Sequence, residues 1–158
     1  MDQVQALQKT FLFKEFPVKE LERLAAVARY ERRPSDNVLF REGEPGSEFF
    51  ILLNGSVKVL KRNKDGVEEE VAQLGTGSYF GEMAVVDDQH ERSATIITKE
   101  STELLVFAQG EILRLFDNDD RLAHHFYKSL CRGLTRRLRA TTQDATFFRA
   151  LAKERHGG

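Results

Sequence analysis

The stretch Gly75-Thr-Gly-Ser-Tyr-Phe-Gly-Glu-Met-Ala84, followed after seven residues by Arg92-Ser-Ala-Thr95, decides the fold and the site that this sequence predicts. Its small residues allow the backbone to approach a bulky ligand closely. Residues 81–84 are compatible with a single helical turn, whose free N–H groups would point at an anion. Arg92 supplies a planar, permanently charged guanidinium that suits a phosphate. The stretch therefore predicts an anion-binding site.

Glu82 is the unusual member of this stretch, because a phosphate repels a carboxylate. It fits if it accepts a hydrogen bond from a hydroxyl, such as a ribose 2′-OH, while Arg92 offsets the charge. A ribose hydroxyl beside a phosphate describes a cyclic nucleotide. Taken singly, a Gly-Glu pair is usually a turn and an arginine is usually solvated, but both at this spacing in a β-rich chain favour a site. A dinucleotide or P-loop signature is not matched, since the glycines run G-x-G-x-x-x-G and no Gly-Lys-Ser/Thr follows.

The segments Phe80-Gly-Glu-Met-Ala84 and Glu91-Arg-Ser-Ala-Thr95 resemble the phosphate-binding cassette of cyclic-nucleotide-binding domains of the Crp/Fnr type. The resemblance covers roughly Leu12 to Asp144. It implies a mainly β fold, a cyclic-nucleotide-binding β-roll (a double-stranded β-helix, similar to a jelly roll) with N-terminal helices and a long C-terminal dimerisation helix. It also implies a regulatory module that binds cAMP, with cGMP less favoured, and that signals by movement of the C-terminal helix.

The same resemblance implies the binding residues. Gly81 and Glu82 would meet the ribose, and Arg92 and Ser93 would hold the cyclic phosphate. Arg137, on the long helix, would pair with Glu82. The binding residues expected from the cassette are Gly81, Glu82, Met83, Ala84, Arg92 and Ser93.

The remaining expected contacts concern the base. By resemblance, Val59 and Val71 would place apolar side chains against the nucleotide, Thr141 would bind adenine from its own subunit, and Thr142 would do so from the other. Neighbouring side chains on a helix diverge by about 100°, so one pocket can hardly use both threonines of the same chain. Serine rather than threonine at position 93 fits adenine better than guanine.

The chain predicts one domain over residues 1–158. Residues 1–35 predict an N-terminal helical segment, with Pro17 in the first turn of a helix that ends before Pro34. Residues 36–109, with short apolar runs between glycine-bearing turns and a hairpin at Asp65-Gly66, predict the β-roll with its cassette at 79–95. Residues 110–158 predict a short helix and then a long one.

The long helix, expected from Asp120 to Lys153, would extend about 50 Å at 1.5 Å per residue. Its length exceeds a small β-domain, so part of its apolar stripe needs a partner helix, which predicts a homodimer. The stripe consists of Phe126, Leu130, Leu134, Leu138, Thr141, Ala145 and Phe148. The arginines of this helix spread over several faces and are interpreted mainly as solvated, with Arg137 the exception.

Composition excludes several classes of function. A net charge of −1 and a pI near 6.4 lack the basic footprint of a nucleic-acid binder. Only sixteen residues follow Thr142, too few for a helix-turn-helix unit, so no DNA-binding domain and no direct DNA binding are expected. The chain is then either a stand-alone sensor or a fragment of a longer transcription regulator. The downstream protein partner is not indicated.

The single cysteine, Cys131, excludes a disulfide framework and indicates a reducing compartment. No apolar run is long enough to cross a membrane, and we expect a cytoplasmic protein. His124 and His125 face apart on a helix and make a poor metal pair, so no metal is expected. No catalytic constellation stands out, which argues against an enzyme. A dimeric interaction scaffold with a degenerate pocket remains the alternative, although an unused pocket would have little reason to keep a carboxylate facing an arginine.

Overall fold

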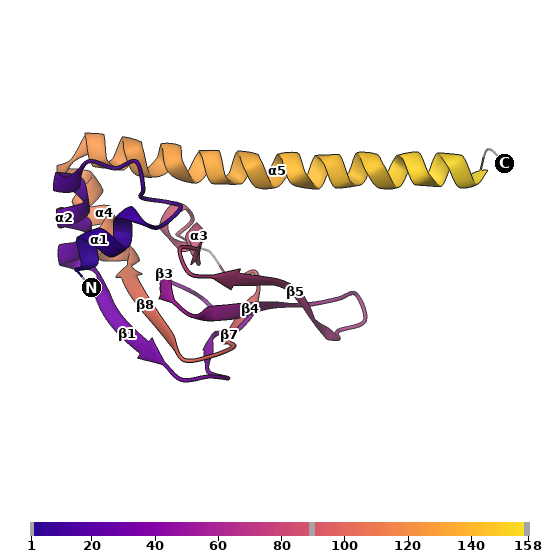
Figure 1. The fold of residues 1–158 in the computed structure, drawn as a ribbon, viewed down its shortest axis with the longest axis horizontal. Coiled ribbons are helices and arrows are strands. Elements are labelled where there is room, and N and C mark those ends of the chain that lie inside the picture. Colours follow the sequence, from indigo (N-terminus) through magenta and orange to yellow (C-terminus); the bar gives the residue numbers. More distant parts are fainter. Residues whose placement is uncertain (1, 89–90, 157–158) are drawn as a thin grey trace.

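The computed structural model describes residues 2–88 and 91–156, without the side chains of residues 141–148, 151, 155 and 156. The helices are α1 (Gln3–Gln8), α2 (Val18–Val27), α3 (Met83–Val86), α4 (Gln109–Asn118) and α5 (Asp120–His156). The strands are β1 (Arg29–Arg33), β2 (Val38–Phe40), β3 (Glu48–Asn54), β4 (Ser56–Arg62), β5 (Glu68–Gly75), β6 (Tyr79–Phe80), β7 (Thr95–Thr98) and β8 (Thr102–Ala108). Helices α1, α2 and α4 gather at one end of the strands, where α5 begins (Figure 1).

The strands form two antiparallel four-stranded sheets, in the orders β1-β8-β3-β6 and β2-β7-β4-β5. Together with the helices and the long α5, they confirm the predicted cyclic-nucleotide-binding β-roll. The hairpin predicted at Asp65-Gly66 joins β4 to β5 and extends away from the rest of the strands (Figure 1). Gly66 there has φ 79°, a conformation that favours glycine.

Two apolar clusters explain why β3 carries an unbroken apolar run rather than an alternating one. Successive strand side chains point to opposite faces. Phe49 and Ile51 therefore pack with the helices, in what we call the helix-side cluster, while Phe50 and Leu52 pack between the sheets. Both faces of β3 are covered from Phe49 to Leu52, so consecutive residues there are apolar.

The helix-side cluster fixes the start of α5 on the β-roll. The ring of Phe126, from α5, lies 6.0 Å from Phe13 and 5.9 Å from Phe49 between centroids, and Phe49 stacks on Phe107 at 4.8 Å. Before α5, Asp119 accepts a hydrogen bond from the Leu122 N–H at 3.1 Å, as expected of an N-terminal capping residue. Further along, Cys131 is exposed.

The N-terminal helical prediction was wrong at its end. Helix α2 ends at Val27, and residues 29–33 form strand β1, paired with β8 from Arg29↔Val106 to Arg33↔Thr102. The sequence Arg-Tyr-Glu-Arg-Arg has no apolar alternation, and so gives no strand signal of its own.

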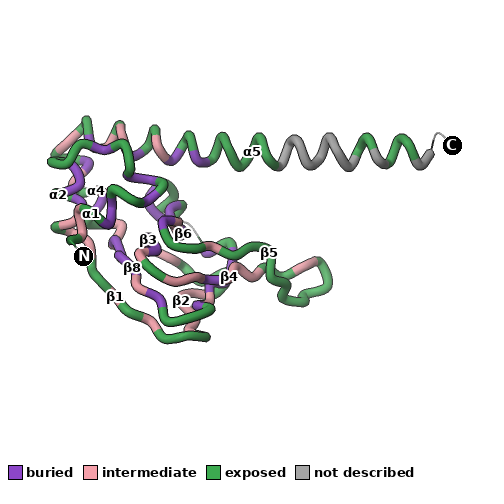
Figure 2. Tube along the Cα trace, viewed as in Figure 1, coloured by how far each residue is buried: buried purple, intermediate pink, exposed green. Residues whose placement is uncertain are grey.

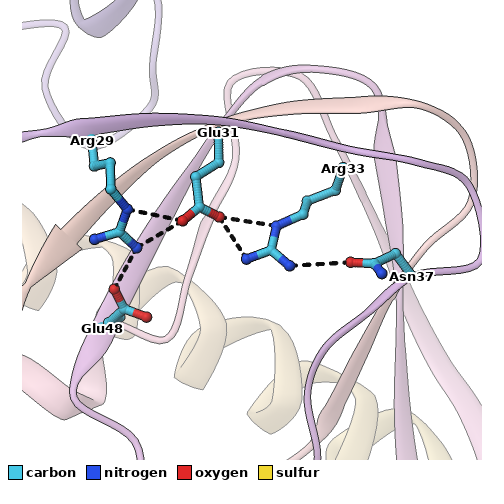
Figure 3. A network of polar contacts seen from close by, with 5 residues as sticks. All are labelled: Arg29, Glu31, Arg33, Asn37 and Glu48. Carbon is cyan, nitrogen blue, oxygen red and sulfur yellow. Dashed lines mark hydrogen bonds and ion pairs between the residues drawn. The ribbon is translucent and has the colours of Figure 1, made fainter.

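Strand β1 lacks apolar alternation, and its charged side chains instead contact one another and strand β3 (Figure 3). Positions 29, 31 and 33 share one face of the strand, and both arginines donate to Glu31, from Arg29 Nε at 2.9 Å and from Arg33 Nη2 at 2.7 Å. Arg29 Nη2 also donates to Glu48 of β3 at 2.8 Å. Backbone pairing and this network therefore stabilise a strand that its composition does not predict.

No helix in the described part of the chain is both long and apolar enough to cross a membrane.

Candidate ligand-binding site

A cavity of about 290 Å³ lies between the cassette, strands β4 and β5, and α5. Its volume is at the lower end of the range for small-molecule sites, roughly 300–1,000 Å³. Of the predicted binding residues, its lining contains Val59, Gly81, Glu82, Met83, Arg92, Ser93 and Arg137. Residues as far apart along the chain as Val59 and Arg137 are thus brought to one concave surface.

Gly81 sets the turn at the centre of the cassette. Its φ is 78°, and a β-carbon here would lie 2.8 Å from Arg92 Nη1 and 3.0 Å from the Glu48 carbonyl oxygen. Both the backbone conformation and the lack of space therefore require glycine. The helical turn expected over 81–84 begins two residues later, as α3 from Met83, with Glu82 just before it.

Arg92 is buried at the base of the cavity, with 5% of its surface exposed. Its Nη2 donates to the Glu48 carbonyl at 2.8 Å, and its guanidinium carbon lies 4.1 Å from the centroid of the Phe40 ring. Nε has no hydrogen-bond partner among the described residues. A buried donor without a partner is unfavourable, so this guanidinium suits an anionic ligand.

Burial lowers the pKa of Arg92 below its ordinary value, against the opposing effect of Glu48, Glu44 and Glu82. Arginine begins from so high a value that the group stays cationic at neutral pH. The cavity therefore holds a fixed positive charge in a poorly solvated place, where its attraction for a phosphate is stronger than in water.

Glu82, 8% exposed, faces the same cavity and pairs with Arg137 of α5, whose Nη1 lies 3.3 Å from Glu82 Oε1. The expected pairing of these two residues is present. The guanidinium of Arg137 also lies 5.8 Å from the ring centroid of Tyr79. Burial raises the pKa of Tyr79, and the nearby Glu82 carboxylate raises it further. Cassette and long helix are thus joined directly at the cavity.

Four predicted binding residues are placed elsewhere or not described. Val71 is 54% exposed and outside the lining, whereas Ala72 lines the cavity opposite Val59. The pairing of β4 with β5 shifts register between Val59 and Leu60, which decides the face that each β5 residue occupies. Ala84 is buried behind the cavity.

The carbonyl of Ala84 accepts a hydrogen bond from Gln109 Nε2 at 2.6 Å. This bond joins Ala84 of the cassette to the first residue of α4, and Ala84 does not line the cavity. The side chains of Thr141 and Thr142 lie outside the described residues.

Part of the lining is not predicted from the sequence, including Phe40, Ala72, Leu74 and Tyr79. Tyr79 stands directly before the recognised Phe80-Gly-Glu segment, and only the fold brings it to α5. A β-carbon at Gly133 would overlap the Tyr79 hydroxyl, so glycine here allows the close approach. The available signal was Gly133 itself, because glycine has a low helix propensity and is unusual within a long helix.

No group of three or more histidine, cysteine, aspartate or glutamate side chains in the described ranges is placed to hold a metal ion. The donors instead suit an organic anion: an arginine for phosphate and a carboxylate for a hydroxyl. Fold and site together define a β-roll domain that binds a small molecule.

The comparisons with known proteins give the family. The family model for the cyclic nucleotide-binding domain matches residues 31–119, and the chain belongs to this family. The chain is 34% identical over 111 residues to the cyclic AMP receptor protein of Thermus thermophilus, covering 69% of this chain and 51% of the relative. It is 35% identical over 96 residues to human cGMP-dependent protein kinase 2, covering 60% of this chain and 12% of the kinase.

A solved cyclic nucleotide-binding domain from Methylobacillus flagellatus superposes with a TM-score of 0.79 at 27% identity, over 90% of this chain and 79% of that one. The chain spans about half the length of the bacterial receptor proteins that it matches.

Proposed function

We propose that this chain is a cAMP-binding sensor domain that acts as a homodimer and signals through movement of α5. One observation carries the proposal: Arg92 and Glu82 are both buried and line the same cavity, and Arg92 Nε has no partner among the described residues. Arg92, with Ser93, would hold the cyclic phosphate, and Glu82, with Gly81, would accept the ribose hydroxyl. The similarity to a cyclic AMP receptor protein supports this ligand class.

The base would lie against Val59 and the inner face of β5, toward α5. Thr141 of the same subunit and Thr142 of the partner would then bind adenine across the subunit boundary. Because Arg137 already contacts Glu82, a ribose bound at Glu82 would compete with or reorient this pair, and so transmit binding to α5. The exposure of Leu134 and Leu138 on α5 supports a partner helix.

Serine at position 93 favours cAMP, whereas the similarity to a cGMP-dependent kinase supports cGMP as the second candidate. We propose that the protein binds the nucleotide without converting it and that it is cytoplasmic. We expect no direct contact between these residues and DNA. The partial coverage of the bacterial relatives supports the alternative that this is the sensor part of a longer regulator.

The test is a calorimetric titration of the pure protein with cAMP, cGMP and cyclic dinucleotides. We expect cAMP to bind most tightly, and Arg92→Leu to weaken it at least tenfold, since truncating one member of a buried charge pair typically costs about 2–5 kcal/mol. If the wild-type protein bound no cyclic nucleotide, the dimeric interaction scaffold would be the remaining alternative. Recovery of 5′-AMP after incubation with cAMP would contradict binding without turnover.

A further inference from the structure

The segment between β2 and β3 contacts both the backbone and the side chain of Arg92. The Arg92 N–H donates to the Glu44 carbonyl at 2.8 Å, and the Gly43 N–H donates to the Arg92 carbonyl at 2.8 Å. Two residues further on, Gly46 lies directly against the Arg92 side chain. The backbone of Arg92 is therefore fixed by one part of this segment, and its guanidinium packs on another.

Gly46 has no room for a side chain. A β-carbon at this position would overlap Nε and the guanidinium carbon of Arg92 and would lie 2.6 Å from its Cδ. The φ of Gly46 is not positive, in contrast to that of Gly43. The turn itself therefore does not demand glycine here, as it would at a position with positive φ. The three atoms nearest to that β-carbon all belong to the arginine.

The same segment continues into the residue that orients Arg92. The Glu48 carbonyl accepts from Arg92 Nη2, while the Glu48 carboxylate pairs with Arg29 on the outer face of β1 (Figure 3). Phe40 covers the guanidinium on another side. Movement of the side chain away from Gly46 would break its alignment with this carbonyl.

We propose that Gly46 is a positioning residue for the ligand: its missing side chain lets the Arg92 guanidinium lie at the depth where it can meet the cyclic phosphate. This inference rests on the proposed function, because it assigns Arg92 the phosphate. Gly46 itself touches no ligand atom in this proposal. It acts only through Arg92, and a substitution at 46 should therefore have no effect of its own once the arginine is gone.

The experiment is a double-mutant cycle of Gly46→Ala and Arg92→Ala, measured in two ways. Calorimetry gives the cAMP affinity of wild type and Gly46→Ala, and urea unfolding without nucleotide gives the stability of all four proteins. We expect Gly46→Ala to weaken cAMP binding at least fivefold and to lower the urea midpoint. In the Arg92→Ala background the midpoint should not change further.

Two control variants separate positioning from general damage. Gly110→Ala replaces a glycine of α4, outside the cavity, that also lacks a positive φ and has no atom within 4 Å of an added β-carbon, so cAMP affinity should stay within error of wild type and the midpoint should not fall. Ile112→Val removes a buried methyl group in α4, so it should lower the midpoint and leave cAMP affinity unchanged.

Wild-type affinity in Gly46→Ala would overturn the proposal, as would an equal fall in midpoint with and without the arginine. Failure of the wild type to bind any cyclic nucleotide would overturn the proposed function instead. The unfolding cycle would still decide, in that case, whether Gly46 acts through Arg92.

Discussion

From Asp120 to Leu130, α5 buries Leu122, Phe126 and Leu130 against the β-roll and the other helices, whereas Leu134 and Leu138, one and two turns further on, are 46% and 66% exposed. The buried stretches of α5 lie toward its start in Figure 2. The apolar stripe is continuous in sequence, yet among its described side chains those of Leu134 and Leu138 are exposed. The difference teaches that one helix serves two purposes. Its first part belongs to the core, and its second part contacts the cassette through Arg137 while it presents Leu134 and Leu138 at the surface.

The largest effect is expected in the covered part. Phe126→Ala removes a ring that packs among Phe13, Phe49 and Phe116, and such truncations typically cost about 3–5 kcal/mol of unfolding free energy. Urea unfolding monitored by circular dichroism measures this. A loss below 1 kcal/mol would mean that the two parts of α5 do not differ as described.

The next effect concerns the junction of α5 with α2. Glu20, buried at 3% exposure, has both carboxylate oxygens within 2.9 Å of His125 Nδ1. His125→Ala removes this partner, and we expect a loss of about 1–3 kcal/mol. The neighbouring His124 is exposed, so His124→Ala is the matched control and should unfold like wild type. Equal loss in both variants would assign the effect to the helix rather than to the Glu20 contact.

In the second part of α5, between Leu134 and Leu138, Arg137→Met removes the ion pair with Glu82 and keeps most of the apolar side chain. The Arg137 side chain is more than half exposed, so we expect a change of about 1 kcal/mol or less in unfolding free energy. Arg137→Met should change the cAMP affinity, upward or downward, by more than the matched variant Arg139→Met does. Of these two arginines, Arg137 is the one that contacts the Glu82 carboxylate. Calorimetry on both variants makes the comparison.

The smallest effect on chain stability is expected in the uncovered part. Leu138→Ser replaces an exposed side chain and should change the unfolding free energy by no more than about 0.5 kcal/mol under conditions where the protein is monomeric. If the helix pairs as proposed, sedimentation at increasing concentration should show weaker dimerisation than in wild type. Unchanged association would place the dimer contact elsewhere.

Much of the fold was predictable because its signals are local. The apolar runs 49–53 and 57–60 and the Asp65-Gly66 turn predicted the strands and hairpin that the structure has. Strand β1 was missed because its stability comes from pairing with β8 and from charges brought together by the fold. No periodicity within Arg29–Arg33 could reveal either.

The site divides in the same way. Gly81, Glu82 and Arg92 were predictable because backbone conformation and ligand chemistry restrict their residue types. Val71 does not line the cavity, because Ala72 is the β5 residue that pairs with Val59 and Val71 falls at the register shift beside it. Tyr79 and Gly46 were missed because each lies against a residue distant in sequence, Gly133 and Arg92 respectively, and such proximity exists only in the folded chain.

The exposed thiol of Cys131 has a practical consequence for spectroscopy. It is the only cysteine of the chain and lies on α5 one residue after buried Leu130, next to the point where the helix leaves the core. A fluorophore or nitroxide could be attached there in the natural sequence, without engineering a label site. Electron paramagnetic resonance between two labelled copies would then measure the separation of their helices directly, with and without nucleotide.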